Sequence, residues 1–141
     1  MPWAIEEKVR QYMRHVDQTL KGSGVRMVVD VKKRMTDSPA SGTVYPSRHS
    51  RRKRHKASAP GEPPSVDLGE YRNQIAMEFR KGTLGNPSEV VVGVRDGYED
   101  QARALGFGRK DGTMAARPHF APAWAAEQPR LKTAFHRKTL L

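Results

Sequence analysis

The residues with the clearest chemical potential are six permanent cations within nine positions. They are Arg48, Arg51, Arg52, Lys53, Arg54 and Lys56, and no acid lies among them. Such a cluster attracts phosphates, because binding exchanges condensed counterions for Lys and Arg. An acidic protein face would satisfy the same charges, and a nuclear localisation signal has a similar composition. A solvated loop is the remaining interpretation, since no aromatic side chain is interleaved to stack on bases.

Patterns for catalysis and metal binding are missing from the sequence. The five histidines fall at His15, His49, His55, His119 and His136, with no acid at metal-ligand spacing. The absence of cysteine excludes disulfides, thiolate metal sites and cysteine nucleophiles. No serine lies in a G-x-S-x-G turn, and neither a P-loop nor G-x-G-x-x-G is present. We therefore expect no enzymatic activity, catalytic residue, metal or cofactor.

The composition predicts one small, basic domain over residues 1–141. The formal net charge is +11, which favours anionic partners. Apolar residues make up 36% of the chain, below the roughly 45–50% of an average domain, so a small core is expected. No apolar run approaches the roughly 20 residues that cross a bilayer, and acids follow the first residues where a signal peptide is basic. We expect synthesis in the cytoplasm.

The elements that position these residues begin with a helix over residues 3–21. Its apolar positions step mostly by three and four: Trp3, Ile5, Val9, Tyr12, Met13, Val16 and Leu20. The segment Gly22-Ser23-Gly24 is expected to end it. The alternation that follows predicts a strand over Val25–Val31, in one sheet with Val90–Val94.

Residues 36–66 contain five of the ten prolines and almost no large apolar residue. They predict a projecting, Pro-rich basic arm, with a short strand at Thr43–Tyr45. A short helix is expected after Asp67, passing into a strand near Met77–Arg80.

The rest of the chain predicts an antiparallel partner strand and a terminal helix. The run Glu89–Val94 is rich in Val and follows a Gly-containing turn. Four glycines indicate irregular structure from Asp96 to Arg117. A helix within Pro118–Leu141 is expected to break or restart at Pro129. The fold class is α+β: a long N-terminal helix on a small antiparallel sheet, an extended basic arm and a C-terminal helix.

Several segments, taken in order, resemble a known family. Ala59–Pro64 reads A-P-G-E-P-P ahead of the helix start, residues 91–93 read V-V-G, and residues 112–113 read G-T. Ala116–Ala123 reads A-R-P-H-F-A-P-A. This series resembles the neck, or tail-completion, proteins that join head and tail in tailed bacteriophages. The sequence departs from that pattern at Tyr98–Gly108, and His119 is an extra or substituted residue.

The resemblance implies a virion structural protein at the neck or tail end, acting as head–tail connector, tail-completion protein or tail terminator. It implies a ring of about six copies, or a multiple of that number, around the DNA channel. The implied partners are adjacent head-completion, connector or tail-tube proteins and the genomic DNA. The implied docking residues are Pro60, Gly61, Pro63, Pro64, Arg117, Pro118 and Phe120.

A small basic nucleic-acid-binding protein is the alternative. It would use the same basic run, although neither a recognition helix nor stacking aromatics are evident. A nuclease is not indicated, because the sequence lacks the arrangement of acids and histidines that metal-assisted hydrolysis needs. The sequence leaves open whether the basic arm faces DNA or a neighbouring protein.

Overall fold

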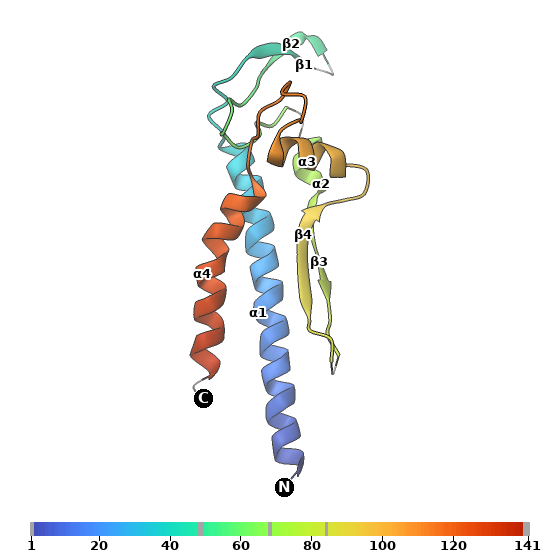
Figure 1. Cartoon of the computed structure of the whole chain (residues 1–141), viewed down its shortest axis with the longest axis vertical. Helices are drawn as coiled ribbons and strands as arrows, with labels where there is room; N and C mark the ends of the chain where they lie inside the picture. The colour runs from blue at the N-terminus through green and yellow to red at the C-terminus, as the bar shows by residue number, and fades with distance from the viewer. Residues whose placement is uncertain (1, 48–49, 68, 84, 140–141) are drawn as a thin grey trace.

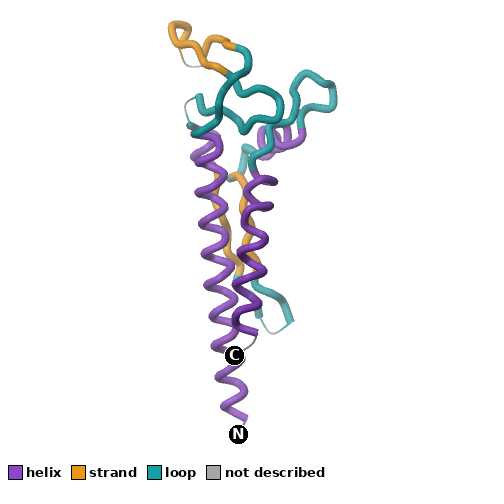
Figure 2. The backbone as a smooth tube through the Cα atoms, turned by 90° about the vertical axis from the view of Figure 1, so that its left-hand side faces the viewer, coloured by secondary structure: helices purple, strands orange, loops and turns teal. Residues whose placement is uncertain are grey.

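Two long helices and a β-hairpin run side by side along the molecule, and a cap of shorter elements covers one end (Figures 1 and 2). The computed structural model describes residues 2–47, 50–67, 69–83 and 85–139. Helix α1 (Pro2–Thr36) is antiparallel to α4 (Phe120–Thr139), so both termini lie at the end away from the cap (Figure 1). The predicted α+β class is confirmed.

Helix α1 does not end at the predicted stop. It continues through Gly22–Gly24, and the predicted strand Val25–Val31 is wrong because this segment is helical. Helical spacing separates its valines: Val31 is buried in the core, whereas Val25 and Val29 are exposed. A strand would have placed all three on one face.

The small residues inside α1 mark close packing rather than a helix end. Ser23 is buried, and a Cβ built on Gly24 would lie 2.7 Å from Cγ1 of Val90 and 2.8 Å from Sδ of Met77. Glycine therefore lets the helix axis approach the sheet more closely than any other residue would. In the sequence alone, two glycines flanking a serine were equally consistent with the end of a helix.

The sheet beneath α1 consists of β3 (Ile75–Arg80) and β4 (Glu89–Val94), as expected. The strands are antiparallel, with Ile75 opposite Val94 and Arg80 opposite Glu89. Both pack against α1. At the hairpin tip the Ser88 hydroxyl donates a hydrogen bond to Asp17 of α1 at 2.6 Å, which fixes the tip to the helix.

The core lies where α1 meets the cap. Its buried apolar residues are Val31, Met35, Tyr71, Ile75 and Ala123. Tyr71 belongs to the predicted short helix, α2 (Glu70–Gln74). The predicted irregular segment 96–117 is partly wrong, because α3 (Glu99–Phe107) forms within it. Ala102 and Leu105 of α3 pack on the core, which supplies a tertiary reason for helix there.

Helix α4 runs through Pro129 without the predicted break. Its contact with α1 is reinforced by Glu127, whose side chain is 3% exposed and accepts a hydrogen bond from Nε of Arg26 at 3.0 Å. The apolar positions of the N-terminal helix were expected to pack on the sheet, which is wrong for Trp3 and Val9, because both are exposed. None of the helices in the described residues is long and apolar enough to cross a membrane.

Candidate polyanion-binding hairpin

Residues 50–56 of the basic run form one strand of a second hairpin, which projects from the cap (Figure 1). Strand β1 (Val44–Ser47) pairs antiparallel with β2 (Ser50–Lys56), and the register shifts between Pro46 and Ser47. The arm predicted for residues 36–66 is therefore extended but has regular structure. Residues 53–56 contain no proline or glycine, unlike the segments on either side, so their backbone amides can form the hydrogen bonds of a β-strand.

The described cations of this hairpin form no ion pair with a described acid, although the charge of Lys56 acts on Glu62 at longer range. Lys53, Arg54 and Lys56 are exposed, and among the described residues none of the three lies within ion-pair distance of a carboxylate. Arg48 lies outside the described residues, as do the side chains of Arg51 and Arg52. The three described cations are therefore available for phosphates or for carboxylates of another molecule.

The side of β2 opposite Arg54 and Lys56 is held to the cap through His55. Its ring lies edge-on to Tyr45, with centroids 5.2 Å apart, and its Nε2 is 3.1 Å from Oγ of Ser65. Ser65 also donates to the Lys56 carbonyl at 3.1 Å. Because a hydroxyl has one proton and a carbonyl only accepts, Nε2 of His55 donates to Ser65. The hairpin is therefore anchored on one side and open on the other.

Ser65, His55 and Asp67 come together in the order of a Ser-His-Asp triad, which sequence spacing did not reveal. Their hydrogen bonds do not match those of a catalytic triad. Nδ1 of His55 lies 3.8 Å from Asp67, beyond hydrogen-bond distance, and His55 donates to Ser65 where a general base must accept. Asp67 instead accepts a hydrogen bond from Ser47 at 3.0 Å. These contacts brace the hairpin.

The base of the hairpin is closed by one backbone and one side-chain hydrogen bond with the second motif segment. The Gly61 amide donates to the Ala116 carbonyl at 3.0 Å, and Nε of Arg117 donates to the Ser58 carbonyl at 3.1 Å. A Cβ on Gly42 would lie 2.6 Å from the Ser58 carbonyl oxygen, so this crossing also requires glycine. Two segments far apart in sequence form one support.

The predicted docking residues occupy that support. Pro64 is buried, Pro63, Arg117, Pro118 and Phe120 are half-buried, and Pro60 and Gly61 are exposed. Gly61 has a φ of 84°, a left-handed conformation that favours glycine. The contacts described for these residues lie within the chain, so their docking on another molecule stays a prediction.

His119 and Tyr71 join the second motif to the core. The Tyr71 hydroxyl donates to Nε2 of His119 at 2.7 Å, and Nδ1 of His119 donates to the Arg117 carbonyl at 3.1 Å. The carbonyl can only accept, so the proton of neutral His119 resides on Nδ1. Burial lowers the pKa of His119 and raises the pKa of Tyr71. His119, which the sequence singled out, is thus a buried structural residue.

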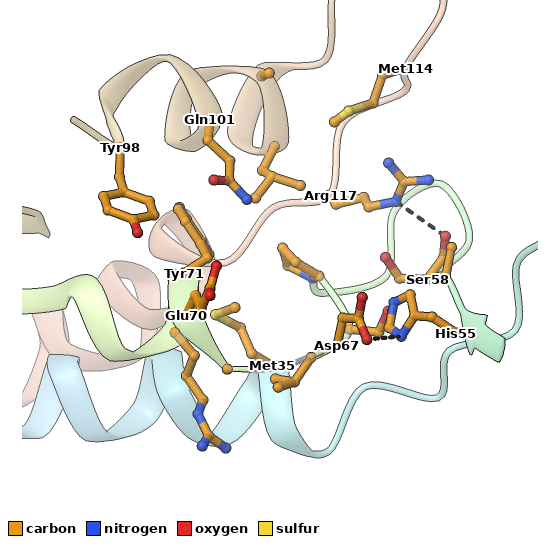
Figure 3. Close-up of a pocket in the computed structure, with 18 of the residues that line it drawn as sticks. Met35, His55, Ser58, Asp67, Glu70, Tyr71, Tyr98, Gln101, Met114 and Arg117 are labelled. Carbon is orange, nitrogen blue, oxygen red and sulfur yellow. Dashed lines mark hydrogen bonds and ion pairs between the residues drawn. The ribbon is translucent and has the colours of Figure 1, made fainter. Parts of the chain in front are cut away.

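An open cavity of about 870 Å³ separates the anchored side of the hairpin from α2 and α3. Figure 3 shows His55 and Asp67 on one side of it and Tyr71 and Tyr98 on the other. Its lining includes cations and acids: Arg72, Arg109, Arg117, Asp67, Glu70 and Asp100. Because the lining of the cavity carries charges of both signs, its charge does not indicate a class of ligand. No group of three potential metal ligands occurs among the described residues.

Comparisons with known proteins leave the family open. No family model matches the chain, and no solved structure matches it. Sequences from Mycobacterium sp. strains MCS, JLS and KMS, each a tRNA-2-methylthio-N(6)-dimethylallyladenosine synthase, are 31% identical over 87 residues. The match covers 56% of this chain, but the chain spans only 16% of each synthase. This similarity is local.

Proposed function

We propose that the chain is a virion structural subunit of a tailed bacteriophage, forming a ring at the neck or tail end that joins the DNA-filled head to the tail. One observation carries the proposal. The two most specific segments of the sequence resemblance meet in space, where Gly61 contacts Ala116 and Arg117 contacts Ser58. Segments that belong to one motif set are expected to form one unit, and here that unit supports the basic hairpin.

The distribution of apolar residues also supports an assembling subunit. Five apolar residues are buried in the described part of the chain, against eleven large apolar residues that are exposed. A core this small stabilises a domain only marginally, so burial against other copies or neighbours would add stability. The proposal assigns no enzymatic activity, metal or cofactor to the chain.

The hairpin would then contact either an acidic face of an adjacent ring or the phosphates of DNA in the channel. We favour the protein partner, because the hairpin base is fixed by the Ser58 and Gly61 contacts and can aim its cations at one surface. A DNA partner needs no such fixed direction, since phosphate contacts carry no sequence information.

The test replaces six cations with glutamine: Arg48, Arg51, Arg52, Lys53, Arg54 and Lys56. A matched control replaces six exposed cations elsewhere, with the same loss of charge: Lys8, Lys81, Arg103, Lys110, Lys132 and Arg137. With a protein partner, electron microscopy of the hairpin variant should show unjoined heads and tails. With a DNA partner, particles should join but lose DNA. Filled, infectious particles from the hairpin variant at control yield would reject both roles.

A small nucleic-acid-binding protein is the second candidate, favoured by the exposed cations Lys53, Arg54 and Lys56. It predicts that the purified chain binds duplex DNA with an affinity that falls steeply with salt, with a slope of about −0.9 for each phosphate contacted. Fluorescence anisotropy of labelled DNA against salt concentration tests this directly. Binding that the control variant loses as strongly as the hairpin variant would rule out a hairpin site.

A further inference from the structure

The β3–β4 hairpin is a sheet of only two strands, so each strand has an outer edge. The Arg95 amide donates to the Gln74 carbonyl at 3.0 Å, and hydrogen-bonded pairs alternate along an antiparallel ladder. The pairs that bond to each other within the hairpin are therefore Ala76 with Gly93, Glu78 with Val91, and Arg80 with Glu89. The residues between them turn their amides and carbonyls outward.

The outward backbone groups of Val90 and Val92 on β4, and of Met77 and Phe79 on β3, have no partner in another element. Among the described residues, no backbone hydrogen bond joins these four to a helix, a loop or the other hairpin. Ile75 differs, because it is 1% exposed and its amide bonds back to α2, so the open part of the β3 edge begins at Met77. A row of free amides and carbonyls at this spacing fits an extended strand.

A strand added to β4 must continue two different faces of the sheet. On one face, Val90 and Met77 lie against Gly24 of α1. On the other face, a Cβ built on Gly93 would meet nothing within 4 Å, and Figure 1 shows no described element along it. β3 alternates in the same way, with Met77 and Phe79 toward α1. A second β3 would therefore extend both faces without changing their character.

Charges on the bare face favour the same partner. Within the chain, Nη1 of Arg80 lies 2.9 Å from Oε1 of Glu89, directly across the ladder. The same register on the free edge of β4 sets Arg80 of a second copy on the other side of Glu89, so that one acid lies between two bases. The other charges of this face, Glu78 and Arg95, would lie opposite uncharged residues. Glu78 would be diagonal to Glu89, as it already is within the hairpin.

We propose that copies of this chain join edge to edge, with the free edge of β4 pairing antiparallel with the free edge of β3 in the next copy. Val90 would bond with Phe79 and Val92 with Met77, which gives about four backbone hydrogen bonds for each contact. Because the two edges are different surfaces, the contact is heterologous and repeats from copy to copy until a ring closes.

This inference rests on the proposed function and deepens it, because it supplies the ring with a repeating contact. The competing arrangement is a two-fold pair of β4 edges, in which Glu89 would face Arg95 of the partner. That pair ends at two copies and leaves both β3 edges open. The next copy's β3 is the partner that repeats a pairing already present in the chain.

Two single-cysteine variants test the contact, since the chain itself contains no cysteine. Glu78→Cys and Val91→Cys place one thiol on each strand, at positions that would lie opposite each other between copies. When the two are mixed, one of them with a size tag, mild oxidation should give a disulfide-linked heterodimer. The matched control mixes Glu78→Cys with Val29→Cys, an exposed valine of α1, and should give none. A heterodimer no more abundant than in the control would overturn the proposal, as would Val91→Cys linking mainly to itself.

A second variant blocks the edge without removing a bond within the hairpin. Val92→Pro deletes an outward amide of β4, whereas Val92→Ala keeps the amide and shortens the same side chain. In the Val91→Cys background, Val92→Pro should abolish the heterodimer and Val92→Ala should retain it, with circular dichroism confirming that both are folded. Equal heterodimer from the two would reject the contact. Loss of head–tail joining without the chain, together with absent crosslinks, would reject this contact and leave the proposed function standing.

Discussion

Two glycines of one helix are expected to respond in opposite directions to the same substitution. Gly22 and Gly24 both lie inside α1, where replacing glycine by alanine favours the helix by about 0.5–1 kcal/mol. At Gly22 the new Cβ would meet only the flexible Nη1 of Arg26, at 3.4 Å. Gly22→Ala should therefore raise the free energy of unfolding by roughly the full amount.

At Gly24 the same methyl group would meet the sheet. Its nearest neighbours are Cγ1 of Val90 at 2.7 Å and Sδ of Met77 at 2.8 Å. Met77 is able to rotate, but Val90 is β-branched and lies in a strand paired with Phe79, so the helix and sheet must separate. Overpacking of this kind costs about 1–3 kcal/mol, which exceeds the gain in helix propensity. Gly24→Ala should lower the stability by about 1 kcal/mol.

Thermal unfolding followed by circular dichroism at 222 nm measures both changes. For a chain of this length 1 kcal/mol shifts Tm by roughly 3–5 °C, so the two variants should differ by several degrees and bracket the parent. Urea midpoints provide an independent check, provided that the m-value is unchanged. If Gly24→Ala stabilises the chain as much as Gly22→Ala does, the close contact between α1 and the sheet does not exist.

Four further variants test the buried polar contacts. Burial lowers the pKa of His119 below its ordinary 6.5, so the unfolded state takes up a proton first as the pH falls. The free energy of unfolding should therefore be highest above about pH 6.5 and should decline below it. In His119→Phe, the plot of Tm against pH should be flatter below about pH 6.5. Tyr71→Phe leaves the buried Nε2 of His119 without a donor and should cost about 1–3 kcal/mol in urea unfolding, whereas an unchanged midpoint would mean that water replaces the hydroxyl. Arg26→Ala should cost roughly 1–3 kcal/mol, more than Glu127→Leu, because it leaves a carboxylate that is 3% exposed with only Arg130, 3.6 Å away, as a cationic partner. Arg26 is 46% exposed and remains hydrated alone, so the reverse order would contradict this account of the pair.

The sequence predicted the parts of the fold in which local pattern and packing agree. The sequence identified both the helix and strand from Glu70 to Arg80 and the Val-rich β4. Turn residues lie at the ends of these segments, and the spacing of their apolar residues fits only one type of secondary structure. Val25–Val31 was misassigned, since its alternation fits a strand while its spacing also fits a helix. Long-range packing favours the helix, including the close approach of Gly24 to Val90, which lies 66 residues away in sequence.

The candidate site was predictable in composition but not in shape. The six cations were evident from their spacing, whereas the pairing of β2 with β1 depends on contacts of His55 with Tyr45, Ser65 and Asp67. The exposure of Trp3 and Val9 had no local signal, because it depends on where the sheet and α4 end. Sequence periodicity identifies an apolar face, and tertiary structure alone determines what covers it.

The proposed place of this chain at the head–tail junction is tested most directly by interrupting its coding sequence in the phage genome and examining the particles by electron microscopy. The account predicts DNA-filled heads and separate tails, with joining restored when the intact chain is supplied from a plasmid. Normally joined, infectious particles in the absence of the chain would contradict it.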